Sequence, residues 1–476
     1  MDEYKRANGD IRAPEGLKER AAGGERRRPG ARWYAAVAAA LAVTVALTAV
    51  LWPAGNSAAL AIYEAEYPQA AAYPQEPRSQ SEAAWEQFNE DWDAWLEDSR
   101  GRRQRGVELM PEGYDDFVAG SAARFLTDTG GENAVYSPLS AYMALAMLAE
   151  LTDGESRAQL LGALGAESLE ELRTGANALW EGVYSDDGML TTIPASSVWI
   201  DAGHELNGGP LETLAESYYA SSYRGEMGSP ELDGALADWI DAQTGGLLSK
   251  QAREIQLSPE TVIALVNTLY FSGKWTGEFN ESATEPGMFH SPGGDVEAQF
   301  MHKSGARNYF WGEDFAAVGL GFENGAEMWL MLPDEGVSAE ELVESGAAAD
   351  FVEQGWDWPD SKYLIVNMAV PRFDVESTMD LAEGLRALGV EDVFDIRSAD
   401  FSPLTEEALF VSAVKHSARV TVDEEGCTAA ALTVIPAATS MEPPDEEVDF
   451  VLDRPFVFAI TSETGAVLFM GVVNTP

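Results

Sequence analysis

Helical and strand patterns alternate from about Glu112 to Pro476 without a break in composition long enough to be a second linker. This stretch of about 365 residues can bury a sizeable core, and we expect it to fold as one large domain. Cys427 is the only cysteine, so no intramolecular disulfide can brace that domain. Burial of apolar side chains must stabilise it, and the hydrophobic content of 46% is ordinary for such a protein.

The charge balance limits the partners that the chain can bind. It has 30 Lys and Arg against 80 Asp and Glu, a net charge of −50. Such a field repels phosphate backbones, sulfated polysaccharides and anionic lipids, so nucleic acid and heparin-like polyanions are disfavoured. One cysteine and four histidines supply little material for a metal site, and we expect no metal and no cofactor.

The N-terminal end differs from the rest of the chain. Residues 1–32 hold nine Lys and Arg against six Asp and Glu, and the apolar run 33–52 follows. Twenty helical residues span about 30 Å, the thickness of the bilayer core. We expect a cytoplasmic tail (1–32) and a transmembrane signal-anchor (33–52), with the remaining chain extracellular. The alternative is secretion after cleavage near Ala61.

Residues 53–110 are acidic and poor in apolar side chains, which is typical of a stalk or linker. Within them Trp85, Phe88, Trp92 and Trp95 recur at helical spacing and predict an amphipathic helix from about Ser81 to Asp98. This stripe is expected to pack on the protein's own body, with partner binding as the alternative.

Arginines crowd the segment from Arg100 to Arg105, directly after the aromatic stripe. We interpret this segment as a solvated, flexible linker. A trypsin-like protease could cut it and release the external domain, which is a second route to a secreted form.

Motifs of common enzymes are missing from the sequence: it has no G-x-S-x-G, no H-E-x-x-H, no P-loop and no dinucleotide-binding glycine fingerprint. An isolated histidine is more often a structural hydrogen-bonding group than a catalytic base. We therefore expect a protein that is not an enzyme.

Seven segments in order resemble the serpin family of serine protease inhibitors. They are Asn133–Leu148, Trp239–Gly245, Val266–Trp275, Leu332-Pro333, Pro371–Phe373, Arg454–Phe458 and Val467–Pro476. The resemblance covers residues 111–476 and implies the α+β serpin fold, with three β-sheets, about nine helices and an exposed reactive-centre loop. It implies a monomer, and together with the N-terminal run it suggests a bacterial, membrane-anchored member.

The functional segment begins where an alternating strand, Val420 to Glu424, ends. Gly426 is a flexible joint, and the small uncharged residues after it could lie exposed or enter a sheet at little cost. The segment is similar to the serpin hinge, and the resemblance assigns that role to Glu424, Glu425, Gly426, Cys427, Thr428, Ala429, Ala430, Ala431, Leu432 and Thr433. Cys427 and Leu432 depart from the family pattern, but both are uncharged.

The family resemblance places the reactive bond about seventeen residues beyond Glu424, at Ser440-Met441, with Thr439 as the alternative position. No Lys or Arg occurs from Cys427 to Glu447, so a trypsin-like target is disfavoured. Elastase-like and subtilisin-like proteases, which accept small or apolar residues, fit the segment better.

Five further residues match parts of the central sheet that must move when the loop inserts. Ser137, Ser140, Asn267 and His416 resemble the polar cluster beneath the sheet, and Trp275 lies where the family's sheet opens first.

The resemblance implies a covalent inhibitor that acts as a suicide substrate. The protease attacks the exposed loop, forms an acyl-enzyme, and is trapped as the cleaved loop inserts into the central sheet. The alternatives are a non-inhibitory serpin-fold binding or chaperone protein, a cross-class inhibitor of papain-like cysteine proteases, and a surface protein that acts through its Trp-rich stalk.

Overall fold

The computed structural model describes residues 60–77, 79, 81–187, 191–323, 325–427 and 444–476. Residues 55–476 form one compact unit. The expected tail and membrane span, residues 1–52, lie outside the described residues. Within the described ranges, no helix has the length and apolar character needed to cross a bilayer. The signal-anchor at 33–52 stays a prediction.

Sheet A has eight strands among the described residues. Its order is β1 (Ala61–Tyr63), β5 (Ala220–Gly225), β4 (Thr191–Asp201), β6 (Ile263–Lys274), β14 (Gly426–Cys427), β13 (Val411–Val422) and β12 (Phe373–Asp380), with β3 (Ser185–Asp186) paired to β4.

Sheet B has nine strands. Its order is β15 (Glu447–Val451), β11 (Ser361–Pro371), β8 (Gly294–Trp311), β9 (Phe315–Gly321), β10 (Glu327–Pro333), β16 (Phe456–Thr461), β17 (Val467–Val473) and β2 (Ala134–Tyr136), with β7 (Thr284–Ser291) paired to β8.

Eleven α-helices accompany the sheets in the described ranges. They are α4 (Glu82–Glu108), α5 (Tyr114–Phe125), α6 (Pro138–Leu151), α7 (Gly154–Ala163), α8 (Leu169–Val183), α9 (Gly208–Ser217), α10 (Pro230–Gln243), α11 (Ser249–Glu254), α12 (Ala339–Glu344), α13 (Ala347–Gln354) and α14 (Ala382–Ala387). Short 3₁₀ turns lie at Glu281–Ala283, Gly355–Asp357 and Asp392–Phe394.

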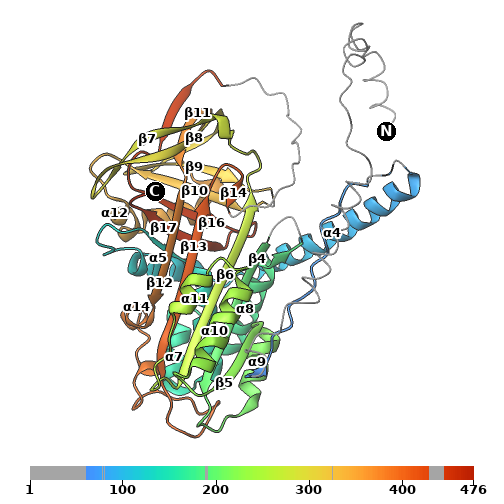
Figure 1. The fold of residues 1–476 in the computed structure, drawn as a ribbon, viewed down its shortest axis with the longest axis vertical. Helices are drawn as coiled ribbons and strands as arrows, with labels where there is room; N and C mark the ends of the chain where they lie inside the picture. Colours follow the sequence, from blue (N-terminus) through green and yellow to red (C-terminus); the bar gives the residue numbers. More distant parts are fainter. Residues whose placement is uncertain (1–59, 78, 80, 188–190, 324, 428–443) are drawn as a thin grey trace. The chain divides into compact units, whose positions relative to one another are not determined.

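Local sequence explains where several helices begin. The Ser137 hydroxyl accepts from the amide of Ser140, and Pro138 occupies the first turn of α6, where a missing N–H costs nothing. Ser168 caps α8 in the same way. Every residue of α6 is buried, because this helix lies beneath β4 and β6 and also contacts β17. Helix α10 covers the opposite face of β6 (Figure 1).

The α+β architecture predicted from the sequence is present, but two of the predicted counts are wrong for the described residues. Two hydrogen-bonded sheets occur instead of three, because the 18-residue strand β8 pairs with β7, β11 and β9 and joins them into one sheet. Eleven α-helices occur instead of about nine. One of the additional helices is α4, which precedes the predicted domain.

The described part of the predicted stalk packs on the body, which corrects its interpretation as a linker. Strand β1 pairs with β5, and the Tyr67 ring lies against Trp180 and Tyr184. A few aromatic side chains can therefore hold a segment on the domain even when most of its residues are polar. Ala61, the expected cleavage position, lies within β1.

The predicted amphipathic helix is confirmed and is longer than expected. Ser81 caps it, and it continues past Asp98 to Glu108. Trp92 and Trp95 contact Tyr73 of the preceding segment, and the Trp95 indole donates to Asp187 of the domain. The ring contacts of Trp85 and Phe88 are with other members of the stripe, so among the described residues the C-terminal end of the stripe is the part joined to the domain. The segment from Arg100 to Arg105 is helical, and its interpretation as a flexible linker is wrong.

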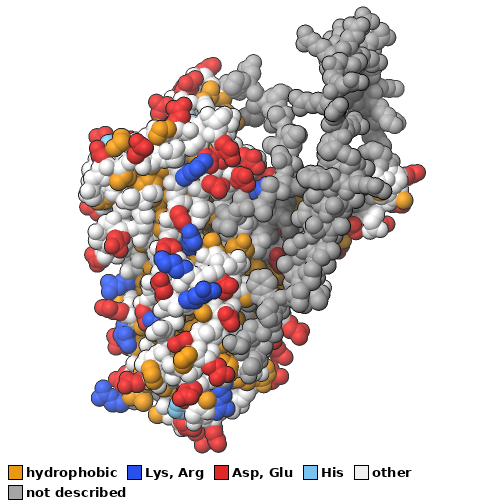
Figure 2. Space-filling view, viewed as in Figure 1, with side chains coloured by type: hydrophobic (Ala, Val, Ile, Leu, Met, Phe, Trp, Pro, Cys, Tyr) orange, Lys and Arg blue, Asp and Glu red, His pale blue; other side chains and the backbone are white. Residues whose placement is uncertain are grey.

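Acidic side chains occur along the full length of the face shown in Figure 2, with basic side chains among them. This distribution follows from the large excess of Asp and Glu in the sequence.

Candidate functional site

The two central strands of sheet A are paired at one end and separated at the other. Strands β6 and β13 run parallel, and their pairing extends from Ile263 and Val411 to Asn267 and His416. Beyond that point β14 lies between them and runs antiparallel to both, with Cys427 opposite Gly273 on one side and Val422 on the other. The hinge therefore already forms the first two residues of an additional strand.

Gly426 allows this strand to begin. A Cβ atom at this position would lie 2.2 Å from the Gly273 carbonyl oxygen and 2.8 Å from the Cα of Lys274. Both are backbone atoms that cannot rotate away. The close approach of β14 to β6 therefore requires glycine at position 426.

Trp275 holds the turn that precedes β14. Its indole nitrogen donates to the Asp423 carbonyl oxygen (2.9 Å), and its amide donates to the Glu425 carbonyl oxygen (3.1 Å). The ring is buried and stacks on Phe322 at 4.5 Å. Trp275 therefore lies beside the turn through which the chain enters sheet A, and its role in opening the sheet stays a prediction.

Glu424 forms the principal ion pair of the site. Nε and Nη2 of Arg372 lie 2.9 Å and 2.6 Å from its Oε1, and the Thr284 hydroxyl also donates to this carboxylate. Burial opposes ionisation of Glu424, but the hydrogen bonds from Arg372 and Thr284 outweigh it and hold the pKa of the carboxyl below its ordinary range. The negative charge is therefore retained at neutral pH and fixes the hinge to the end of β11.

The structure describes four of the ten predicted hinge residues: Glu424, Glu425, Gly426 and Cys427. The Cys427 side chain is 2% exposed and belongs to the main core. The other hinge residues, 428–433, lie outside the described residues, as do Thr439, Ser440 and Met441 of the predicted reactive bond. The position of that bond stays a prediction.

The predicted polar cluster is brought together beneath the paired end of β6 and β13. His416 lies opposite Asn267 in the strand register. Its Nε2 accepts from the Ser137 amide (3.1 Å), and the Ser137 hydroxyl accepts from the Ser140 amide (3.2 Å). The cluster joins the two strands to the start of α6.

His416 is neutral at physiological pH. It is 2% exposed, and burial lowers the pKa of its imidazole to about 4. Since Nε2 accepts a hydrogen bond, the neutral ring carries its proton on Nδ1, which has no hydrogen-bond partner among the described residues. The side chain is therefore a structural acceptor, and protonating it would place a charge in the core.

Three contacts of the site were not predicted from the sequence. Arg372 and Thr284 hold Glu424, and the Ser196 hydroxyl accepts from the Asn267 amide (2.7 Å). Arg372 lies within a segment that resembles the family, but its partner is 52 residues away in the chain. Such long-range pairs carry no local sequence signal.

The described ranges contain no group of His, Cys, Asp and Glu side chains that could hold a metal ion. The site is a partly opened sheet that can accept a strand.

Comparisons with known proteins agree on one family. The family model described as "Serpin (serine protease inhibitor)" matches residues 113–476. Serpin-ZXA from Oryza sativa subsp. japonica is 30% identical over 364 residues, which cover 73% of this chain and 91% of that protein.

Two solved structures have the same fold. The structure of tengpin, a thermophilic serpin in its native state, is 26% identical with a TM-score of 0.68, covering 76% of this chain and 93% of tengpin. Arabidopsis AtSerpin1 in its native stressed conformation is 25% identical with a TM-score of 0.68, covering 79% of this chain and 98% of that one.

Proposed function

The chain belongs to the serpin family, and from this we propose that it inhibits serine-type endopeptidases as a suicide substrate. The protease serine attacks the carbonyl carbon of the reactive bond, for which we propose Ser440-Met441, with Thr439 as the alternative position. An ester forms between the protease and residue 440. The peptide bond breaks, and the new amino terminus at Met441 leaves with a proton supplied by the protease histidine.

The observation that carries this proposal is the partial insertion of the hinge. Strand β14 already pairs antiparallel with β6 and β13, the orientation that further insertion requires. Continuing both registers places residues 428–432 opposite the separated ends of the two strands. Thr433 would then lie opposite both Asn267 and His416. Insertion beyond Leu432 must therefore break the pairing of β6 with β13.

The polar cluster would control that step. Insertion of Thr433 separates His416 from Asn267, whose pairing closes the sheet. The Ser137 amide holds His416 from the start of α6, and Ser196 of the adjacent strand β4 holds Asn267. The cleaved loop gains hydrogen bonds to both strands as it enters, which supplies the free energy for moving the attached protease.

Target specificity follows from the residues around the reactive bond. The segment from Cys427 to Glu447 has no Lys or Arg, so we propose a protease with a small or apolar specificity pocket, elastase-like or subtilisin-like. A papain-like cysteine protease would be the cross-class alternative, because its thiolate can attack the same bond.

We further propose that the serpin domain is held outside the cell by the apolar run 33–52. The support is its length and the arginines that precede it. Labelling with a membrane-impermeant reagent tests this, since a tag at residue 2 should be protected and the serpin domain should be accessible.

The proposed inhibition is tested by incubating the protein with elastase-like, subtilisin-like, papain-like and trypsin-like proteases. We expect an SDS-stable complex with the elastase-like or the subtilisin-like enzyme, and a released peptide that begins at Met441. Loop cleavage by all the non-tryptic enzymes without any complex would instead establish a non-inhibitory member of the family.

A further inference from the structure

Residues 60–112 precede the segment that matches the family, yet the structure shows them bound to the domain. Strand β1 adds to the free edge of β5, where the Arg224 amide donates to the Leu60 carbonyl oxygen (2.8 Å) and the Ala65 amide donates to the Ser221 hydroxyl (3.1 Å). Sheet A therefore has an edge strand from outside the family-matched region.

Tyr67 fixes the chain that follows β1. Its ring centroid lies 5.3 Å from that of Trp180 and 5.8 Å from that of Tyr184, both in the C-terminal part of α8 or its cap. Its hydroxyl donates to Gln243 at the end of α10 (3.2 Å). One side chain thus joins the N-terminal segment to two helices that lie on opposite faces of sheet A.

Helix α4 then crosses α8 at a pair of glycines. A Cβ atom on Gly106 would lie 2.9 Å from the Cα of Gly182, so the two backbones are in direct contact. Arg105 pairs with Glu181 at 2.7 Å, and Arg102 donates to the Tyr184 carbonyl oxygen. The arginine segment is therefore part of the contact with α8.

The same helix reaches sheet B. Arg103 pairs with Glu463 in the turn between β16 and β17, and a Cβ atom on Gly106 would lie 3.1 Å from the Thr464 methyl group. Helix α4 thus contacts both α8 and the β16–β17 turn.

These two contact regions are linked to strands on opposite sides of the place where an additional strand would enter sheet A. The Trp180 indole donates to the Pro194 carbonyl oxygen of β4 (2.7 Å), which links the end of α8 to the half formed by β5, β4 and β6. The β16–β17 turn belongs to sheet B, whose Val135 amide donates to Ser377 of β12 in the other half. Where β6 and β13 are still paired, an inserted strand widens the gap between the halves by about 4.8 Å.

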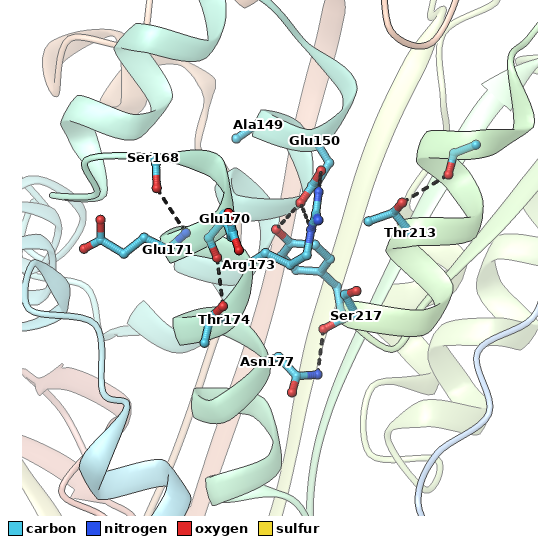
Figure 3. A network of polar contacts seen from close by, with 12 residues as sticks. Ala149, Glu150, Ser168, Glu170, Glu171, Arg173, Thr174, Asn177, Thr213 and Ser217 are labelled. Atoms are coloured by element: carbon cyan, nitrogen blue, oxygen red, sulfur yellow. Dashed lines mark hydrogen bonds and ion pairs between the residues drawn. The ribbon is translucent and has the colours of Figure 1, made fainter.

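The other end of α8 is held separately. Figure 3 shows Arg173 of α8 and Glu150 of α6 pointing toward each other, and two hydrogen bonds of 2.7 Å and 2.8 Å join them. The C-terminal end, with Gly182, is therefore the end that α4 restrains.

We propose that residues 60–77 and 81–108, here called the latch, hold the two halves of sheet A together and slow its opening. The proposal rests on the proposed loop-insertion mechanism. Helix α4 cannot keep its contacts with both α8 and the β16–β17 turn while the halves move apart by a strand width. The latch thereby sets how long the native state persists before its loop inserts.

The test measures sheet opening without a protease. The full chain is incubated with a synthetic peptide of residues 427–440, and the peptide-bound fraction is followed by native electrophoresis and by its raised thermal midpoint. In Gly106→Leu the new side chain forces α4 off Gly182, and we expect incorporation about tenfold faster, the factor that corresponds to roughly 1.4 kcal/mol of barrier.

Gly101→Leu is the matched control, because a Cβ atom at Gly101 meets nothing within 4 Å on the same helix. It should incorporate the peptide at the wild-type rate. Tyr67→Ala removes the ring contacts that hold the segment after β1, and it should also incorporate the peptide faster than wild type. Tyr67→Phe keeps those ring contacts and should incorporate the peptide at nearly the wild-type rate.

Equal rates in Gly106→Leu, Tyr67→Ala and the two controls would overturn the latch while leaving loop insertion intact. A different outcome is that the wild type and all variants unfold cooperatively but none of them takes up the peptide. That result would contradict the proposed loop insertion, and with it the latch proposal.

Discussion

At the scale of single residues, Gly426 determines whether the hinge can stay in sheet A. Its neighbours on β6 are backbone atoms, and a methyl group has no room beside the Gly273 carbonyl oxygen. The adjacent Cys427 is the only thiol and is buried, so it reports on the position of the hinge.

We expect Gly426→Ala to displace β14 and expose Cys427. The variant should react with an aromatic disulfide reagent at least about fivefold faster than wild type, since the cost of the clash is of the order of 1–3 kcal/mol. The colour released by the reagent measures the rate. Gly101→Ala, on the open side of α4, is the control and should react at the wild-type rate. If Gly426→Ala also reacted at the wild-type rate, the clash would be relieved without displacing β14, which would contradict the prediction.

His416 makes stability depend on pH. Its pKa in the folded protein is about 4, below the ordinary value of 6.5, so the unfolded chain binds the proton more tightly. The neutral ring makes its full contribution to the free energy of unfolding above pH 6.5. As the pH falls toward 4, the free energy of unfolding decreases by up to roughly 3 kcal/mol from this group.

We expect His416→Gln to lose less stability than wild type between pH 6.5 and 4. Urea unfolding at several pH values measures the two free energies of unfolding, and their difference isolates His416 from the many carboxylates that also titrate. Parallel curves for the two proteins would contradict the buried neutral imidazole.

At the scale of secondary-structure elements, the register of β14 assigns a face to each residue that follows it. Cys427 lies opposite Gly273 and faces the main core, which also contains Phe271 and Leu269 of β6. Since side chains alternate along a strand, inserted Ala429 and Ala431 would face the same core, whereas Ala430 would lie opposite the half-buried Tyr270.

Two neighbouring substitutions therefore have different predicted effects. Ala431→Glu would bury a carboxylate in the core on insertion and should convert the proposed inhibitor into a substrate that is cleaved without forming a complex. Ala430→Glu should retain most of the complex, because its carboxylate can reach solvent. Titration of a susceptible protease gives the stoichiometry of inhibition for each variant, and equal loss in both would refute the assigned register.

The elements that the sequence predicted well are those with local signals. Alternation predicted a strand up to Glu424, and the structure ends that strand at Val422. The family resemblance indicated the hinge and the cluster of Ser137, Asn267 and His416. The aromatic stripe predicted that helix α4 ends near Asp98, and the arginine-rich segment after it was interpreted as a linker. Contacts with Gly182, Glu181 and Glu463 sustain the helix there, and no local pattern reports them.

At the scale of the whole molecule, the proposed function requires a fold that is not the most stable arrangement of its own chain. Sheet A is closed at Asn267 and His416 and open at β14, so one strand can still be added. The Arg372–Glu424 pair, the polar cluster and the latch each restrain a different part of that sheet. A sequence resemblance indicates the family, but only the three-dimensional arrangement shows where these restraints lie.

The most direct measurement of this account is the thermal midpoint of the protein before and after its loop is cut by a non-tryptic protease near Ser440. Insertion adds about ten backbone hydrogen bonds at roughly 1 kcal/mol each. Each added kcal/mol of unfolding free energy raises the thermal midpoint by about 2 °C or more, so cleavage should raise the midpoint by roughly 20 °C or more. A cleaved protein that unfolds at the same temperature as the intact one would show that its loop does not enter sheet A, and would contradict the proposed mechanism.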